Sequence, residues 1–163
     1  MKKAQTTDSA KIRVLKTASD LFYRQGYRST GTNEIIEKAG VAKASFFYHF
    51  PTKEALALAY LEDLHVQEAK NLLRFVNKWQ KPYDRFRAVI KFIEPWIKTN
   101  ELRGCGFMNM VSEVPDKKSP LRKTAKEHYE ALGGLITQLT QELIDSGPKR
   151  YRHLDVSTVA DSY

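Results

Sequence analysis

The sequence predicts an all-α fold, and three observations support that class. Apolar residues recur at the helical period along nearly all of the 163 residues. Glycines and prolines punctuate these periodic segments where helices are expected to begin or end. No segment shows the strand pattern of an OB or RRM domain. The composition, 42% hydrophobic and 28% charged, is that of an ordinary globular protein with one well-buried core or a small domain beside a larger one.

Two short helices are expected behind a longer first helix. The first helix is expected over residues 10–25, where one apolar stripe follows the helical period, with Gly26 as its C-cap. The sequence Thr30-Gly31-Thr32-Asn33 supplies N-cap chemistry for a short second helix that ends at Gly40. A third helix is expected from about residue 43 to Phe50. Two short helices joined by a glycine-containing turn predict a helix-turn-helix.

The third helix contains the ring-rich run Phe46-Phe47-Tyr48-His49-Phe50. Phe46 and Phe50 are four residues apart, so they share the face that packs on the other helices. Lys43, Ser45, Tyr48 and His49 then fall on other faces. The run is therefore predicted to be part core and part exposed edge of hydrogen-bonding side chains suited to a groove.

Longer helices are expected in the rest of the chain. Thr52 is placed to N-cap a helix over residues 53–78. Pro82 is expected to start the next helix, and Pro95 to kink or break it.

A last long helix is expected from Ser119-Pro120, as N-cap and N1, to about Asp145. Gly133-Gly134 in its middle should cost roughly 1 kcal/mol each against alanine. Close approach of a neighbouring backbone would be a reason to keep them.

Charge is distributed unevenly along the chain. Residues 1–53 hold ten Lys and Arg against four Asp and Glu, whereas residues 54–163 hold seventeen against fifteen. An excess of positive charge confined to the first third indicates binding of a polyanion, although a solvated basic face would show the same excess.

The compartment is expected to be the cytoplasm. One cysteine, Cys105, excludes an internal disulfide framework and fits a reducing environment. No stretch approaches the roughly 20 apolar residues that span a bilayer, so no membrane association is expected. The N-terminal sequence has lysines but no apolar run behind them, so it is not typical of a signal peptide.

Residues 14–56 resemble the DNA-binding region of the tetracycline-repressor (TetR) family. The resemblance rests on the A-x-x-LF-x-x-x-GY start, the I-x-x-x-AGV turn and the HF-P-x-KEAL finish, which occur in register. It implies a helix-turn-helix DNA-binding domain, here residues 1–52, and a helical ligand-binding and dimerisation domain, here residues 53–163. It also implies a one-component transcriptional regulator, usually a repressor, that binds a palindromic duplex as a homodimer and is released by a small apolar or aromatic effector.

The resemblance also implies roles for individual residues. Ala44, Ser45 and Tyr48 are expected to face base edges, and His49 and Lys53 to meet phosphates. Phe47 departs from the family, which usually has Tyr at that position as a phosphate donor. Gly31 stands where the family often has Thr, so Thr30 or Thr32 would supply any hydroxyl contact. The expected DNA-binding set is Thr30, Thr32, Asn33, Lys43, Ala44, Ser45, Phe47, Tyr48, His49 and Lys53.

The expected effector-binding set is apolar with a few polar groups. Cys105 has two open interpretations, a small buried residue at a helix start or a pocket-lining or oxidant-sensing thiol. The set comprises Trp96, Cys105, Phe107, Met110 and Tyr129.

No catalytic, cofactor or metal motif is present in the sequence, so a non-enzymatic protein is expected. None of the four histidines lies three or four residues from another or from Cys105. Alternatives are a single-stranded nucleic-acid binder that uses the rings of residues 46–50 as a stacking platform, an enzyme in the C-terminal region, and a regulator without a ligand. Family members commonly dimerise through two long helices, of which only the first is evident and residues 155–161 look like the start of the second. Either this sequence lacks a C-terminal segment or the dimer is held differently.

Overall fold

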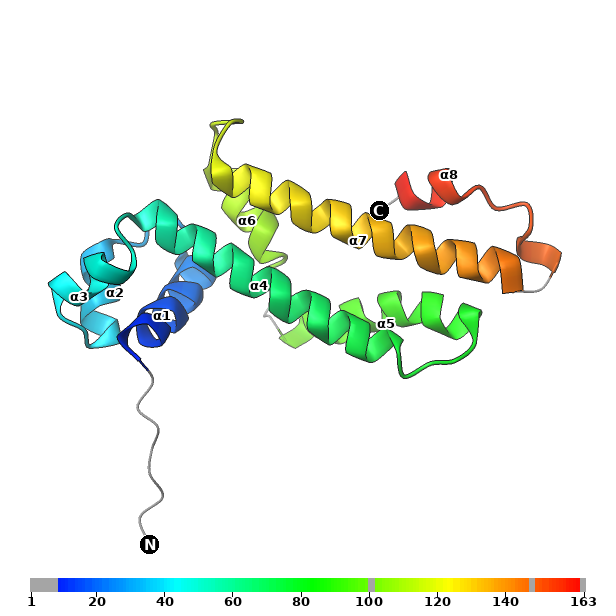
Figure 1. Cartoon of the computed structure of the whole chain (residues 1–163), viewed down its shortest axis with the longest axis horizontal. Coiled ribbons are helices and arrows are strands. Elements are labelled where there is room, and N and C mark those ends of the chain that lie inside the picture. The colour runs from blue at the N-terminus through cyan, green and yellow to red at the C-terminus, as the bar shows by residue number, and fades with distance from the viewer. Residues whose placement is uncertain (1–8, 100–101, 147–148, 162–163) are drawn as a thin grey trace, which may run out of the picture. The chain divides into compact units, whose positions relative to one another are not determined.

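The computed structural model describes residues 9–99, 102–146 and 149–161, and within these ranges it contains helices and no strand (Figure 1). The chain forms two compact units. The first comprises the described residues up to Asp63 together with Cys105–Thr124, and the second comprises Leu64–Gly104 and Ala125–Tyr163. The all-α prediction is confirmed. The expected boundary after residue 52 falls inside the first unit, because the start of the following helix and a later short helix belong to that unit.

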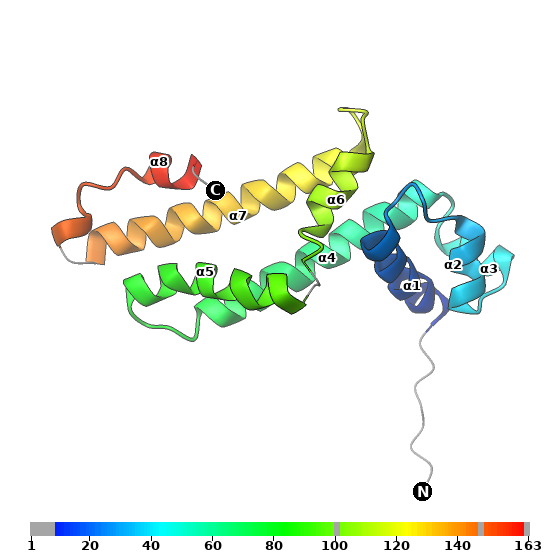
Figure 2. The same cartoon turned by 180° about the vertical axis from the view of Figure 1, so that it is seen from behind.

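Three helices of the first unit form the predicted helix-turn-helix region (Figure 2). They are α1 (Ala10–Gln25), α2 (Thr32–Ala39) and α3 (Lys43–His49). The side chain of Ser9 accepts the Ile12 amide and so caps α1. Helix α2 has Gly31 at its N-cap with no side-chain cap. The threonines around Gly31 therefore do not cap this helix as the sequence predicts.

The turn between α2 and α3 depends on Gly40, which adopts a left-handed conformation with φ 61°. Its amide donates to the Glu37 carbonyl, and the Val41 amide donates to the Ile36 carbonyl. This is the hydrogen-bond pattern of a Schellman motif, which satisfies the last carbonyls of a helix and favours glycine at this position. The turn therefore fixes where α3 begins.

Apolar residues from all three helices form the core of this region. Val14 and Ala18 of α1, Ile35 of α2 and Phe46 of α3 have no exposed surface. Burying a large apolar side chain stabilises a fold by about 1.5–3 kcal/mol, so this small cluster contributes much of the stability of the region.

Helix α4 (Lys53–Val76) contributes residues to both units. Thr52 accepts the Ala55 amide at 3.0 Å, which confirms the predicted N-cap. Helix α6 (Gly106–Glu113) belongs to the first unit. Arg122 donates to the carbonyls of Val111 and Val114 at its C-terminal end.

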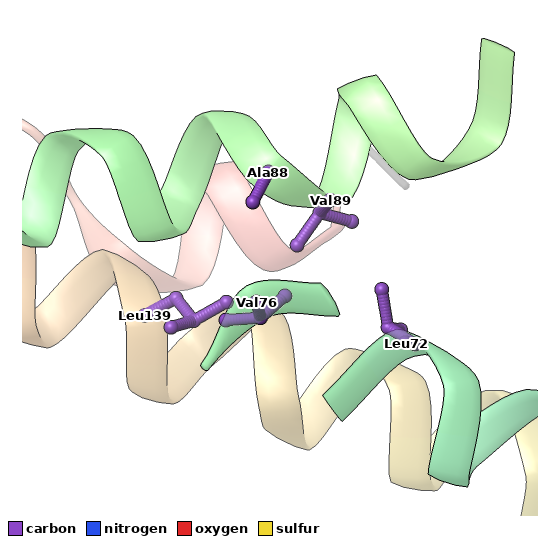
Figure 3. Close-up of a cluster of buried hydrophobic side chains, with 5 residues drawn as sticks. All are labelled: Leu72, Val76, Ala88, Val89 and Leu139. Carbon is purple, nitrogen blue, oxygen red and sulfur yellow. The ribbon is translucent and has the colours of Figure 1, made fainter. Parts of the chain in front are cut away.

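The second unit contains α5 (Pro82–Thr99), most of α7 (Pro120–Ser146), the 3₁₀ helix η1 (Lys149–Tyr151) and α8 (Val156–Asp161). Figure 3 shows its central cluster, in which side chains of α4, α5 and α7 meet. The buried members are Leu72, Val76, Ala88, Val89 and Leu139.

Two sequence predictions concern helix interiors. Pro95 lies inside α5, which continues to Thr99, so of the predicted kink or break the break does not occur. Gly133 and Gly134 of α7 have no heavy atom within 4 Å of where a Cβ would be. The predicted close approach of a backbone is therefore not present within this chain. Ser119, by contrast, accepts the Leu121 amide at 3.2 Å at the start of α7, as predicted.

Candidate nucleic-acid interface

The turn of the helix-turn-helix is held by Arg13 of α1. Its Nε donates to the Ala39 carbonyl at 3.2 Å, and its Nη2 donates to the Gly40 carbonyl at 3.4 Å. Hydrogen bonds from a charged group are stronger than those between neutral groups. Arg13 therefore ties the end of α2 to α1 and fixes the position from which α3 projects. Sequence analysis missed this role, because nothing in an arginine on an exposed helix face indicates a distant carbonyl partner.

Helix α3 divides into a buried and an exposed face, as the spacing predicts. Phe46 is fully buried and Phe50 is 3% exposed, whereas Tyr48 is 82% exposed. Lys43 and Ala44 are exposed, and Ser45 and His49 are half-buried. The exposed side chains offer a positive charge, hydroxyls and a ring nitrogen, which suit the phosphates and base edges of a major groove.

Rings pack edge to face along the exposed edge of α3. The Phe47 ring lies against Phe46 with centroids 5.0 Å apart, and the Tyr48 ring lies against His49 at the same separation. Phe47 is 39% exposed. Because Phe46 and Phe50 are buried, the stacking platform of the single-strand alternative lacks two of its rings, and of the Phe and Tyr rings in residues 46–50 only those of Phe47 and Tyr48 are exposed.

The residues expected at the start of α2 differ in their accessibility. Asn33 is exposed and Thr32 is half-buried. Thr30 has no exposed surface, and its hydroxyl donates to the Gly26 carbonyl at 2.6 Å. Its position argues against a direct DNA contact, because the side chain stabilises the preceding turn. Thr32 remains as the source of any hydroxyl contact there.

Lys53, at the first position of α4, is half-buried beside the α1–α2 turn. Its Nζ lies 4.6 Å from the centroid of the Tyr27 ring and donates to the Arg28 carbonyl at 3.4 Å. Burial lowers the pKa of Lys53, and the charge of Glu113 opposes that effect. A phosphate contact by Lys53 would therefore compete with contacts that the lysine makes within the protein.

Glu113, the last residue of α6, caps the α1–α2 turn. Its two carboxylate oxygens accept the Tyr27 amide at 3.2 Å and the Arg28 amide at 2.7 Å. A Cβ on Gly26 would clash with Glu113 Oε1, so this position of the carboxylate depends on glycine at residue 26. The sequence gives no signal for this contact, because 85 or more residues separate the partners.

The predicted effector-binding residues do not all fall in one unit. Phe107 and Met110 of α6 are buried in the first unit, and Cys105 is half-buried at its N-cap. Tyr129 of α7 is 37% exposed in the second unit. Trp96 lies in α5, and its side chain is outside the described part of the structure. A single effector site that contains all five residues stays a prediction.

The described ranges contain neither a membrane-spanning helix nor a metal-binding cluster. No helix there is both long enough and apolar enough to cross a membrane. No group of three or more His, Cys, Asp or Glu side chains in these ranges is arranged to hold a metal ion.

The fold and the exposed face of α3 define a helix-turn-helix DNA-binding protein. Residues 14–60 match the model of the bacterial regulatory proteins of the tetR family. The HTH-type transcriptional regulator YxaF of Bacillus subtilis is 47% identical over 132 residues, which cover 80% of this chain and 69% of that protein. The chain therefore belongs to the TetR family of transcriptional regulators.

Two further comparisons extend the similarity beyond the first unit, which contains the helix-turn-helix and is called the head. The HTH-type transcriptional regulator LmrA of Bacillus subtilis is 27% identical over 152 residues, which cover 92% of this chain and 79% of that protein. The crystal structure of a TetR-family transcriptional regulator from Streptomyces coelicolor is 27% identical, with a TM-score of 0.80 over 94% of this chain and 89% of that chain. The helical C-terminal region is therefore also shared with the family.

Proposed function

We propose that this protein is a transcriptional repressor that binds a palindromic double-stranded operator as a homodimer and is released by a small apolar or aromatic effector. The observation that carries the proposal is the division of α3. The rings of Phe46 and Phe50 are buried, whereas Lys43, Ala44 and Tyr48 stand exposed on a helix that a Schellman turn and Arg13 hold in place. A helix fixed in this way can enter a major groove without a large ordering cost.

The division of labour on α3 follows from side-chain chemistry. Lys43 carries a charge that binds phosphate without regard to sequence, whereas Tyr48 and Ser45 can discriminate between base edges. Thr32 and Asn33 at the N-terminus of α2 add polar groups where the helix dipole attracts phosphate. The expected binding is salt-dependent and prefers duplex.

The palindromic operator follows from symmetry. Most soluble homo-oligomers are two-fold dimers, and two identical heads on a two-fold axis bind inverted half-sites. The half-sites would be spaced by one helical turn of DNA or a multiple of it.

The effector part of the proposal rests on the second unit. Its interior is apolar and aromatic, with Phe75, Trp79 and Phe92 around the buried cluster. The Trp79 indole N–H is buried and has no hydrogen-bond partner in the described residues. Ligand sites are mostly apolar with a few polar groups, and this composition suits a small aromatic molecule.

Fluorescence anisotropy of the full chain tests the DNA-binding part. The operator is first selected from a library of random 30-base-pair duplexes and is then compared with its isolated strands across a salt series. Duplex preference is expected. Lys43→Ala should weaken all duplexes and lower the salt slope by about one. Tyr48→Ala should erode the preference for the selected sequence.

A matched control separates these effects from general loss of charge. Lys70 is an exposed lysine of α4 in the second unit, so Lys70→Ala should leave DNA affinity nearly unchanged. The proposal would be contradicted if the single strands bound as tightly as the duplex or more tightly, and if Tyr48→Ala then lost more affinity than Lys43→Ala. Binding of a half-site duplex as tightly as the full site would contradict the dimeric mode.

A further inference from the structure

Three ionisable side chains that lie far apart in the sequence meet inside the second unit. His65 and Glu68 stand on α4, and His128 stands on α7. His65 Nδ1 and His128 Nδ1 are 3.0 Å apart, and His128 Nε2 is 3.5 Å from Glu68 Oε2. The His128 side chain is 10% exposed and that of Glu68 is 22% exposed. Because 63 residues separate the two histidines, their spacing in the sequence gave no indication of this pair.

Burial changes the charge of this cluster. It raises the pKa of Glu68 to about 7. Burial, followed by the effect of His65, lowers the pKa of His128 to about 4. Between these two values the contact between His128 and Glu68 joins two neutral groups and is not an ion pair, although its distance alone would permit one. Above about pH 7, Glu68 becomes a carboxylate beside a neutral His128.

Donors and acceptors can be counted for the state in which Glu68 is ionised. His128 then directs its Nε2–H toward the carboxylate, so its Nδ1 accepts from Nδ1–H of His65. His65 is left with an acceptor at Nε2, and Glu68 is left with its second oxygen. Neither atom has a hydrogen-bond partner in the described residues, and neither is sealed from solvent. On His65 and Glu68, therefore, the atoms that a ligand can reach are hydrogen-bond acceptors.

The surroundings favour a ligand that brings a donor. No lysine or arginine in the described ranges forms an ion pair with Glu68, and the titratable group that contacts it is His128 on α7, which in turn contacts His65. The Tyr129 ring lies edge-on to His128 with centroids 5.3 Å apart, so an aromatic side chain stands next to the cluster. A half-buried acceptor without a donor is costly, and a ligand donor would relieve that cost.

We propose that His65, Glu68 and His128 form the polar subsite of the effector-binding domain, which accepts a hydrogen bond from a hydroxyl or ammonium group on an otherwise apolar effector. The inference rests on the proposed function insofar as the second unit binds an effector. It adds the chemical class of the ligand: donors bind, the corresponding ethers bind less well, and carboxylates are rejected. Carboxylates are rejected because they would place a second negative charge beside Glu68.

A series of ligands with one aromatic body tests the inference on the full chain. Calorimetry at pH 8 would compare 4-phenylphenol, 4-phenylbenzylammonium, 4-methoxybiphenyl and biphenyl-4-carboxylate. The first two carry a donor, the third has none, and the fourth is an anion. A hydrogen bond to a charged group predicts that the donor ligands bind at least about ten-fold more tightly than the ether. The preference should shrink at pH 5.5, where Glu68 is protonated.

Variants assign the effect to named atoms. Glu68→Gln removes the charge with little change in shape, and His65→Phe removes the Nε2 acceptor. Each should reduce the preference for donors to less than about three-fold while binding of 4-methoxybiphenyl is retained, which also shows that the variant is folded. The control is Glu130→Gln, which removes an exposed acid of α7 that pairs with Lys126 and should change nothing.

Other outcomes are equally informative. Any of four results would overturn the subsite. The phenol and the ether could bind equally, or the carboxylate could bind most tightly. Glu130→Gln could have an effect as large as that of Glu68→Gln, or none of the ligands could bind. The anisotropy assay on the operator reports separately on the proposed function. A donor ligand that binds through Glu68 but leaves operator affinity unchanged would support the subsite and contradict release by an effector.

Discussion

Replacing Gly26 with alanine tests how the head is held together. Gly26 has φ 94° and ψ 159°, a region of backbone space that is essentially restricted to glycine. The same residue lies beside the Glu113 carboxylate, and an added Cβ would clash with Oε1. The substitution therefore strains the backbone and also pushes the carboxylate away from the amides of Tyr27 and Arg28.

The cost can be built from these two parts. A residue held in such a region costs about 1–3 kcal/mol. Displacing Glu113 weakens two hydrogen bonds from backbone amides to a carboxylate, at 3.2 and 2.7 Å. Because this site is partly exposed, about 1 kcal/mol for each bond is reasonable. We expect Gly26→Ala to lower the free energy of unfolding by roughly 3–5 kcal/mol.

Urea unfolding followed by circular dichroism, at one fixed protein concentration, measures the change. The control is Gly134→Ala, since Gly134 lies within α7 with open space around it and alanine should stabilise the helix by up to about 1 kcal/mol. In a Glu113→Ala background the clash is absent, so Gly26→Ala should cost only its backbone part. The clash would be refuted if the effects of Gly26→Ala and Glu113→Ala on the free energy of unfolding were fully additive. A loss of unfolding free energy below about 0.5 kcal/mol for Gly26→Ala would refute the backbone strain as well.

Three further predictions concern single side chains. Phe46→Ala should destabilise the head by about 3–5 kcal/mol and abolish duplex binding, because Phe46 is fully buried; unchanged unfolding in urea would contradict its role in the core. Phe47→Tyr should tighten binding to all duplexes several-fold in the anisotropy assay without a change in stability, because the ring is 39% exposed and the family hydroxyl is restored; a sequence-selective gain would count against a phosphate contact. The hydrogen bond from Gln138, with that from Arg85, lowers the pKa of Glu142, so its stabilisation is present above the unfolded pKa of about 4.5 and is lost as the pH falls through the folded value. Wild type should then lose more stability than Glu142→Gln between pH 6 and pH 3, and parallel curves would disprove the linkage.

Local rules predicted much of the head. The limits of α1, its C-cap at Gly26, the burial of Phe46 and Phe50, and the caps at Thr52 and Ser119 all depend on residues within one or two helical turns. Interactions of this range leave a periodic or capping pattern in the sequence.

The contacts that the sequence did not predict join residues far apart in the chain. Arg13 reaches Ala39 across 26 residues, Glu113 reaches Arg28 across 85, and His65 reaches His128 across 63. Arg13, Glu113 and His65 each resemble an ordinary polar residue on the surface of a helix when the sequence is considered alone. Only the tertiary fold brings a donor to its acceptor, and no periodicity within a helix records that pairing. The same limit applies to Thr30, for which the sequence predicts a DNA contact and gives no sign of the hydrogen bond from its hydroxyl to the Gly26 carbonyl.

Two helices give the proposed effector subsite a covalent connection to the head. Helix α4 runs without interruption from Lys53, which contacts the α1–α2 turn, to His65 and Glu68. Helix α7 includes Arg122, which binds the end of α6 next to Glu113, and His128 less than two turns later. A ligand shifts a conformational equilibrium only by the difference in its affinity for the two states. For an effector at the His128 cluster to release DNA, it must therefore favour one arrangement of these helices over another, and a coupling of 1–3 kcal/mol would change operator affinity roughly 5- to 150-fold.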